Sequence, residues 1–182
     1  MPQFVAFSPT VEIWGGSLLG MVEGLVQGGA PRDEILAFLA QGGILDPDPD
    51  GWYPQQGVLD TLRSAELRFG AEVLRAAGRA IPVHSRFPPE VDCLERALTT
   101  LDLAYQVNHR GGRIGHYIAR RLGSRRMEIF CDNPYGCDLD LGILDTLLAR
   151  HQNPGDHLHV HHAPGTACRK EGHRACVYQV AW

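Results

Sequence analysis

The stretch that decides the fold is residues 131–182, CDNPYGCDLDLGILDTLLARHQNPGDHLHVHHAPGTACRKEGHRACVYQVAW. Four of the five cysteines and six of the nine histidines lie inside it, so the side chains that bind soft metals gather in this part of the chain. Residues 138–151 have the apolar spacing of a helix, whereas 157–162 and 175–182 have the patterns of short strands. We therefore expect a helix followed by two strands.

The rest of the chain places helices before strands. Helical spacing predicts helices at 16–27, at 31–41 and from Pro89 onward, and at 56–80 either one long helix or two that meet at a break at Gly70. The later part predicts strands: a hairpin formed by 103–109 and 113–122, and then a strand at 125–131. This order predicts an α+β domain with an antiparallel sheet of about five strands and helices packed on one face.

A length of 182 residues suits one domain, with room for an N-terminal extension. The segment 46–54, DPDPDGWYP, is rich in proline and aspartate and predicts a linker. We therefore expect a helical lead-in over residues 1–50 and a ligand-binding domain over residues 51–182.

The composition narrows the classes of partner. Apolar residues make up 44% and charged residues 21%, which is ordinary for a globular protein in water. The net charge of −4 argues against nucleic acid, and the basic run 109–126 lacks the interleaved aromatic residues of a single-strand binder. No targeting segment or membrane span is visible in the sequence. We expect a cytoplasmic protein that binds neither nucleic acid nor membrane, with reduced thiols.

The cysteines and histidines of the last third predict one tetrahedral metal site. Cys137 precedes a helix, whose N-terminus stabilises a thiolate, and Cys168 and Cys176 flank a seven-residue loop. His161 and His162, at the end of the histidine-rich strand, are the nearest imidazoles in sequence. Zinc is the expected cofactor, with iron or haem as the weaker alternative. Buried structural thiols beside a solvated histidine face are the other interpretation of the same residues.

A second polar group lies in the predicted hairpin. Tyr105, His109, His116 and Tyr117 are predicted to form the polar end of a ligand pocket, and ordinary cross-strand pairs are the alternative. Apolar residues of the helices are expected to form the walls of this pocket: Leu62, Leu67, Val73, Leu94 and Leu98. A small apolar molecule is the expected ligand.

The pattern Cys137-DLDL-Gly142-ILDTLL, followed by an extended run and Cys168-RKEGHRA-Cys176-VYQV, resembles the 4-vinyl-reductase-like domain. That family shares its core with subunits of the TRAPP tethering complex and includes sensor domains of phenol-responsive activators. The resemblance implies a structural zinc held by Cys137, Cys168, Cys176 and a glutamate. This chain has Gly165 where the glutamate is expected, so His161 or His162 is the chemical substitute.

Two functions follow from these residues. The first is a sensor-type binding domain with a structural zinc site and an apolar pocket, which acts through a protein partner or a homodimer. The second is a metal-dependent or tetrapyrrole-related enzyme. The number of protein ligands discriminates between them, because a metal with four protein ligands has no open position for substrate. We favour the binding domain.

Overall fold

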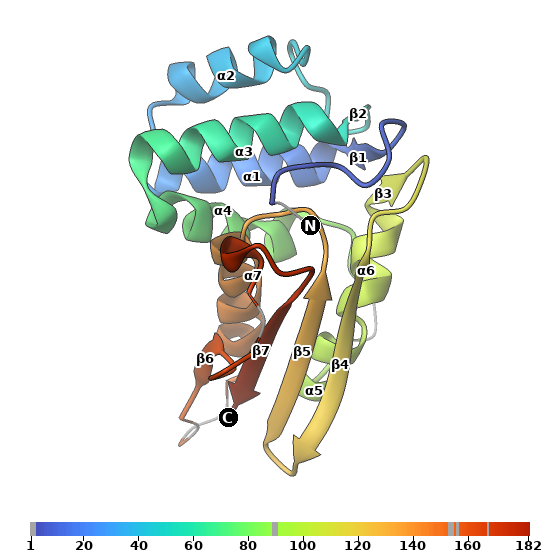
Figure 1. The fold of residues 1–182 in the computed structure, drawn as a ribbon, viewed down its shortest axis with the longest axis vertical. Helices are drawn as coiled ribbons and strands as arrows, with labels where there is room; N and C mark the ends of the chain where they lie inside the picture. The colour runs from blue at the N-terminus through green and yellow to red at the C-terminus, as the bar shows by residue number, and fades with distance from the viewer. Residues whose placement is uncertain (1–2, 89–90, 153–154, 156, 167) are drawn as a thin grey trace.

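A computed structural model describes residues 3–88, 91–152, 155, 157–166 and 168–182 (Figure 1). The longer helices are α1 (Gly15–Gln27), α2 (Arg32–Gln41), α3 (Gln55–Phe69), α4 (Ala71–His84) and α7 (Cys137–Arg150), and the shorter ones are α5 (Leu94–Thr99) and α6 (Leu101–Val107). The strands are β1 (Glu12–Trp14), β2 (Trp52–Pro54), β3 (His109–Arg110), β4 (His116–Gly123), β5 (Arg126–Asp132), β6 (His159–His162) and β7 (Cys176–Ala181). The chain is therefore α+β, as predicted.

The strands form two antiparallel sheets, so the prediction of one five-stranded sheet is wrong. A small sheet has the order β2-β1-β3, and the main sheet has the order β4-β5-β7-β6. The missing strand is the first arm of the predicted hairpin, because residues 101–107 form α6. The tight hairpin joins β4 to β5 instead, one strand later than predicted.

Side chains alternate between the two faces of the main sheet, and one of these faces is covered by helices. Tyr117, Cys131 and Cys176 stand side by side in register across β4, β5 and β7, and all three are buried. Helices α5, α6 and α7 lie behind the sheet in Figure 1, whereas α1 to α4 form a helical layer above it. The covered face therefore brings residues from separate parts of the chain to one buried region.

The helical layer is joined to the sheet where α4 crosses α7. Gly78 and Gly142 meet at this crossing, and a Cβ atom built on Gly142 would overlap the carbonyl oxygen of Arg75. Glycine at both positions lets the two backbones approach closely enough to bring the first turn of α7 next to the helical layer. The buried face of α7 carries Leu139, Ile143 and other core residues.

Other boundaries test the sequence patterns directly. The predicted break at Gly70 is confirmed: this residue separates α3 from α4 with a φ of 92°, in the region that favours glycine. The predicted linker is wrong in part, since Trp52–Pro54 is β2 and pairs with β1. The predicted helix start at Pro89 lies outside the described residues, and the next helix begins at Leu94. Among the described residues, no helix is long and apolar enough to cross a membrane.

Candidate functional site: a cysteine–histidine cluster and an aromatic cavity

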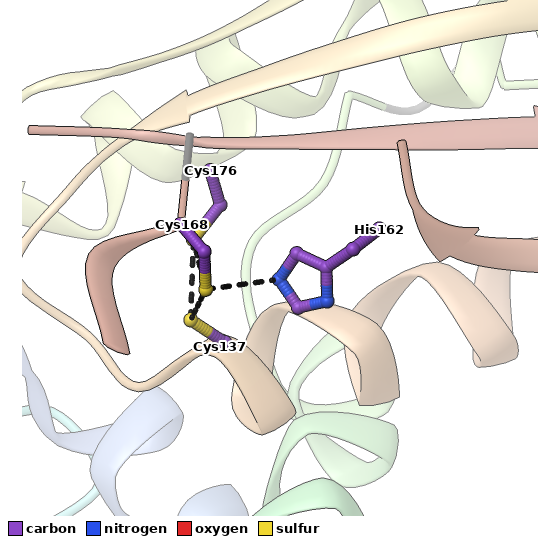
Figure 2. Close-up of side chains that lie close together, drawn as sticks. All are labelled: Cys137, His162, Cys168 and Cys176. Atoms are coloured by element: carbon purple, nitrogen blue, oxygen red, sulfur yellow. Dashed lines mark hydrogen bonds between the residues drawn. The ribbon is translucent and has the colours of Figure 1, made fainter. Parts of the chain in front are cut away.

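Three cysteines and one histidine meet at the N-terminus of α7 (Figure 2). Cys137 is the first residue of α7, Cys176 is the first residue of β7, and Cys168 precedes the short 3₁₀ turn Arg169–Glu171. His162 ends β6 and points inward from the edge of the sheet. The four side chains therefore come from a helix, two strands and a loop.

The spacing of the donor atoms is that of a tetrahedral site. The Cys137 Sγ lies 3.1 Å from the Cys176 Sγ and 3.7 Å from the Cys168 Sγ, and Cys176 and Cys168 are 4.0 Å apart. The His162 Nε2 is 3.8 Å from the Cys168 Sγ, and all four donor atoms lie within 4.8 Å of one another. Sulfur ligands about 2.3 Å from one central ion at tetrahedral angles are about 3.8 Å apart. The cluster has the donor types and the dimensions to hold a soft metal ion.

Hydrogen-bond donors surround the sulfur atoms. The hydrogen bond with the Cys137 thiol, together with the charge and N–H groups of Arg169, lowers the pKa of Cys176 to about 3. The backbone N and the Nε of Arg169 lie 3.3 and 3.4 Å from the Cys176 Sγ, and the Gln3 Nε2 lies 2.7 Å from the Cys137 Sγ. Hydrogen bonding to Cys176 and burial raise the pKa of Cys137. Without a metal, Cys176 is the thiolate and Cys137 is its donor.

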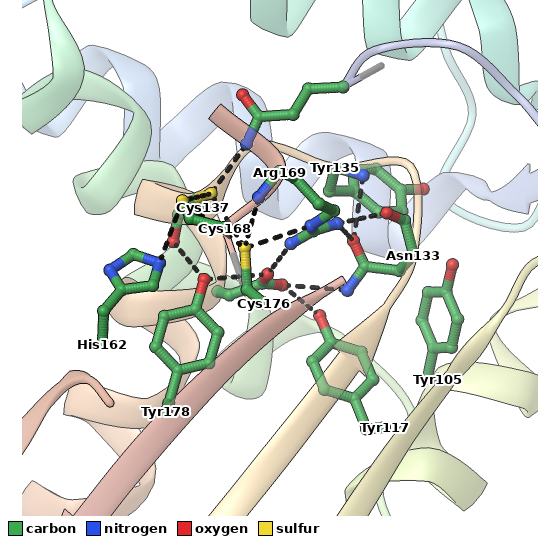
Figure 3. Close-up of polar contacts among 12 residues, drawn as sticks. Tyr105, Tyr117, Asn133, Tyr135, Cys137, His162, Cys168, Arg169, Cys176 and Tyr178 are labelled. Atoms are coloured by element: carbon green, nitrogen blue, oxygen red, sulfur yellow. Dashed lines mark hydrogen bonds and ion pairs between the residues drawn. The ribbon is translucent and has the colours of Figure 1, made fainter. Parts of the chain in front are cut away.

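A buried ion pair lies directly beneath this cluster (Figure 3). The Arg169 guanidinium pairs with the Asp140 carboxylate and also donates to the backbone and side-chain oxygens of Asn133. Asp140 accepts further hydrogen bonds from the Tyr117 hydroxyl at 2.6 Å and from the Asn133 Nδ2 at 3.1 Å. Burial raises the pKa of Asp140, and Arg169 opposes that rise. The buried polar groups of Arg169, Asp140 and their neighbours are thus hydrogen-bonded to one another in place of water.

An ordered network of aromatic side chains continues from Tyr117. The His109 Nδ1 lies 2.8 Å from the carbonyl oxygen of Tyr105, so this nitrogen must carry the proton. The His109 Nε2 is then the acceptor for the Tyr135 hydroxyl at 2.7 Å, and this hydroxyl accepts from the Gln55 Nε2 at 3.2 Å. Burial lowers the pKa of His109 to about 4, so the imidazole is neutral at pH 7.

These aromatic rings line a small cavity of about 40 Å³ between the helical layer and the sheet. Its walls come from β1, α1, α6, β3, β4 and α7, from the end of α4 and the segment after it, and from the loop before α7. The lining residues are Ile13, Ser17, Met21, Ile81, Ser85, Phe87, Leu101, Ala104, Tyr105, Asn108, His109, Tyr117, Tyr135, Leu139 and Ile143. The Tyr105 hydroxyl donates to the carbonyl oxygen of Ile114 at 2.7 Å, and the other two tyrosine hydroxyls are bonded as described. The tyrosines therefore present ring surfaces to the cavity, while their hydroxyls bind protein atoms.

Four of the five predicted metal ligands are brought together, and His161 is not. Neighbouring residues of a strand point to opposite faces, so His162 faces the cysteines while His161 is exposed opposite Gln179. Cys131 is buried in the register position beside Cys176 but lies outside the cluster.

Three of the four predicted ligand-binding residues line the cavity: Tyr105, His109 and Tyr117. His116 does not, because its side chain is exposed on the edge strand β4, 3.3 Å from Asp102. The predicted apolar walls also differ from the observed ones. Leu67 is 78% exposed on α3, while Leu62, Val73, Leu94 and Leu98 are core residues outside this cavity.

No local sequence pattern selects Arg169, Asp140, Gln55 or Tyr135 as residues of the site. A charged residue at a loop or at the start of a helix is usually solvated, and only the tertiary structure makes the first two a buried pair. Asn133 offered a partial signal, since asparagine before proline favours a turn in which its side chain bonds the backbone. Its Oδ1 does accept from the Tyr135 N at 2.9 Å.

Comparison with known proteins places this geometry in a recognisable fold. No protein-family model and no curated protein matches the chain. Among solved structures, it is similar to a mutant H-NOX protein from S. oneidensis in the Fe(II) ligation state, with a TM-score of 0.68 and 13% identity over 91% of this chain and 94% of that one. The fold is that of the H-NOX proteins.

Two further structures support this assignment. An Fe(II)NO form of the S. oneidensis protein has a TM-score of 0.67 and 13% identity, with 91% of this chain and 97% of that chain covered. An oxygen-binding H-NOX domain related to soluble guanylate cyclases has a TM-score of 0.63 and 13% identity, with 92% and 93% covered. At such identities the likeness establishes the fold alone.

These neighbours overturn two expectations. The resemblance to the 4-vinyl-reductase-like and TRAPP proteins is wrong, because it rested on a local cysteine pattern, whereas 91 to 92% of the chain superposes on H-NOX proteins. Zinc as the cofactor, with iron or haem as the weaker alternative, is also wrong on this comparison, because the similar structures are described with Fe(II) and with heme. The cysteine–histidine cluster is a separate feature, about which these neighbours say nothing.

Proposed function

We propose that this chain is a sensor-type domain on an H-NOX-like fold that binds a small apolar molecule in the cavity between α6 and α7. The observation that carries the proposal is the cavity itself, whose tyrosine and histidine walls have their polar atoms already paired with the protein. These contacts leave no free O–H or N–H donor on the tyrosines or the histidine, while their ring surfaces remain available to an apolar ligand. Tyr105, His109 and Tyr117 would contact the ligand through their rings.

The size of the cavity limits the ligand. An apolar cavity of about 150 Å³ holds a whole benzene molecule, and this cavity is about 40 Å³. Without rearrangement, the ligand is a molecule of a few atoms. A signal would reach a protein partner or a second copy of the chain through α6 and α7, because side chains of both helices line the cavity.

Xenon tests the cavity because it is apolar and has no hydrogen-bonding groups. Methyl NMR spectra recorded under xenon pressure should show shifts at Met21, Ile81 and Ile143, which line the cavity. An Ala104→Val variant fills part of the same space and should reduce these shifts. Ala97→Val adds the same volume at a buried residue outside the cavity and is the matched control. No shift in the unmodified protein at these three methyl-bearing residues would refute the proposal.

Within this proposal, Cys137, His162, Cys168 and Cys176 bind a thiophilic metal ion that ties α7 to β6, β7 and the loop before β7. Four protein donors complete a tetrahedral ion, so its role is structural and an open catalytic position is not available. The N–H donors of Arg169 and Gln3 would stabilise the thiolates from outside, as such groups do around metal ligands.

Cobalt(II) tests the cluster, because tetrahedral thiolate coordination gives it intense visible absorption. Cys168→Ser should weaken that absorption, and Cys93→Ser, at an exposed cysteine outside the cluster, should leave it unchanged. His162→Ala should alter the spectrum and His161→Ala should not. Elemental analysis of the protein as purified then identifies the natural ion. An absence of thiolate-type absorption after cobalt addition would refute the metal site and leave the cavity untouched.

A haem-bound gas sensor is the second candidate, and the fold is the observation that raises it. Similar structures are described with Fe(II)NO, with bound oxygen and with heme distortion. The residues of this chain do not fit the group, since the cavity of about 40 Å³ is far smaller than the cavity of about 150 Å³ that holds a single benzene ring, and a haem macrocycle is larger still. No step of the proposed function therefore depends on haem.

A further inference from the structure

A haem site needs a cavity for the macrocycle and an axial ligand that faces it, and the ligand is histidine, cysteine, methionine or tyrosine. The aromatic cavity lies between the helical layer and the sheet of this chain, and its remaining space is about 40 Å³. The chain's own rings occupy this region: the Tyr105 ring lies 4.5 Å from His109, 5.2 Å from Tyr117 and 6.3 Å from Tyr135, between ring centres.

Among the described residues that line this cavity, His109 is the one histidine, and both of its ring nitrogens are already hydrogen-bonded. Its Nδ1–H donates to the Tyr105 carbonyl oxygen, and its Nε2 accepts from the Tyr135 hydroxyl. To bind iron, the imidazole would have to release Tyr135 and turn its Nε2 toward the cavity. Tyr135 would then lose its acceptor in a site where Gln55 is already its donor.

The tyrosines are committed in the same way. Each hydroxyl donates to a protein acceptor: Tyr105 to Ile114, Tyr117 to Asp140 and Tyr135 to His109. Burial raises the pKa of all three tyrosines, which opposes the phenolate form that binds iron. The remaining lining candidate is Met21, and a thioether accompanies a histidine in the haem proteins that use it.

We infer that this chain has the H-NOX-like fold without a haem site, and that His109 is a neutral structural residue that fixes Tyr135. The ligand of the proposed cavity is therefore a molecule far smaller than a tetrapyrrole. The inference rests on the proposed function for the location of the ligand site. The test of this inference uses hemin, whereas the test of the proposed function uses xenon, so either one can fail without the other.

The experiment is a titration of the full chain with hemin, followed by absorption and by NMR of the imidazole nitrogens. We expect no stoichiometric Soret band that depends on His109. The His109 nitrogens should show the neutral tautomer with the proton on Nδ1, before and after hemin addition. This NMR readout needs no substitution, so it stays decisive where a His109 variant fails to fold.

Surface histidines provide the control. His159 and His161 are exposed on β6 and can hold hemin on the outside of the protein. Binding that survives His109→Gln and disappears in a variant lacking both surface histidines supports the inference. One equivalent of hemin that remains bound in that surface variant, is lost in His109→Gln, and shifts the His109 nitrogens would overturn it.

Discussion

Acidification should destabilise this protein through His109, and the size of the effect follows from its environment. Burial lowers the pKa of His109 from an ordinary value of 6.5 to about 4 in the folded chain. Between these values the unfolded chain takes up a proton that the folded chain does not, so stability falls as the pH falls from 6.5 toward 4. At about 1.4 kcal/mol per pKa unit, the complete effect is about 3 kcal/mol.

By pH 5 the same relation gives about 2 kcal/mol for a fully buried group. His109 is only partly buried as a residue, and solvent near its exposed part weakens the penalty, so we expect about 1 to 2 kcal/mol. Urea unfolding at pH 7 and at pH 5 measures the difference. His109→Gln removes the titrating group and should reduce the dependence on pH by this amount, and His161→Gln, at an exposed histidine of β6, is the matched control.

The comparison between variants isolates His109 from the thiolates, whose protonation also destabilises the protein in acid but is common to all three proteins. Equal changes in unfolding free energy between pH 7 and pH 5 for the unmodified protein and His109→Gln would refute the neutral, buried assignment. A histidine that remains protonated in the folded state would instead give the opposite sign.

Three further predictions concern the core. Arg169→Met leaves the Asp140 carboxylate buried without its partner and should cost about 3 to 5 kcal/mol of unfolding free energy, whereas Arg120→Met, which breaks an exposed ion pair, should cost less than about 1 kcal/mol. Gly142→Ala should cost at least about 1 to 3 kcal/mol by separating α4 from α7, while Gly123→Ala, with open space around it, should stay within about 0.5 kcal/mol. Both pairs are measured by urea unfolding, and similar losses within a pair would contradict the assigned contacts. A strong chelator should lower the melting temperature of metal-loaded protein, and an unchanged melting temperature would argue against a structural ion.

Local patterns in the sequence predicted the elements well where period and breakers agree. The break predicted at Gly70 separates α3 from α4, and the helix predicted at 138–151 from its apolar spacing is α7. The prediction of a strand at 103–109 is wrong because its short apolar run suits either a strand or a helix, and packing against β4 favours the helix α6. Neither the local period nor composition could assign strands to two separate sheets.

In the candidate site, too, local patterns predicted some residues, while others depend on the tertiary structure. Residue type and clustering located the cysteines, because thiols in such numbers are unusual outside a metal or disulfide setting. Whether His161 or His162 faces the cysteines depends on the register of β6. A shift of one residue would turn His161 toward the cysteines and His162 away from them. The Asp140–Arg169 pair joins residues 29 positions apart in sequence, and no local rule anticipates a buried charge pair.

The place of β7 in the main sheet has a consequence for how the protein is made. This strand follows every other element in the chain, yet it lies in the interior of the sheet between β5 and β6 and supplies Cys176. During synthesis, β5 and β6 emerge first and must wait with unpaired edges until β7 leaves the ribosome. A nascent chain stalled before Cys176 would thus be prone to aggregation, and loss of residues 176–181 would remove an interior strand of the sheet rather than an edge strand.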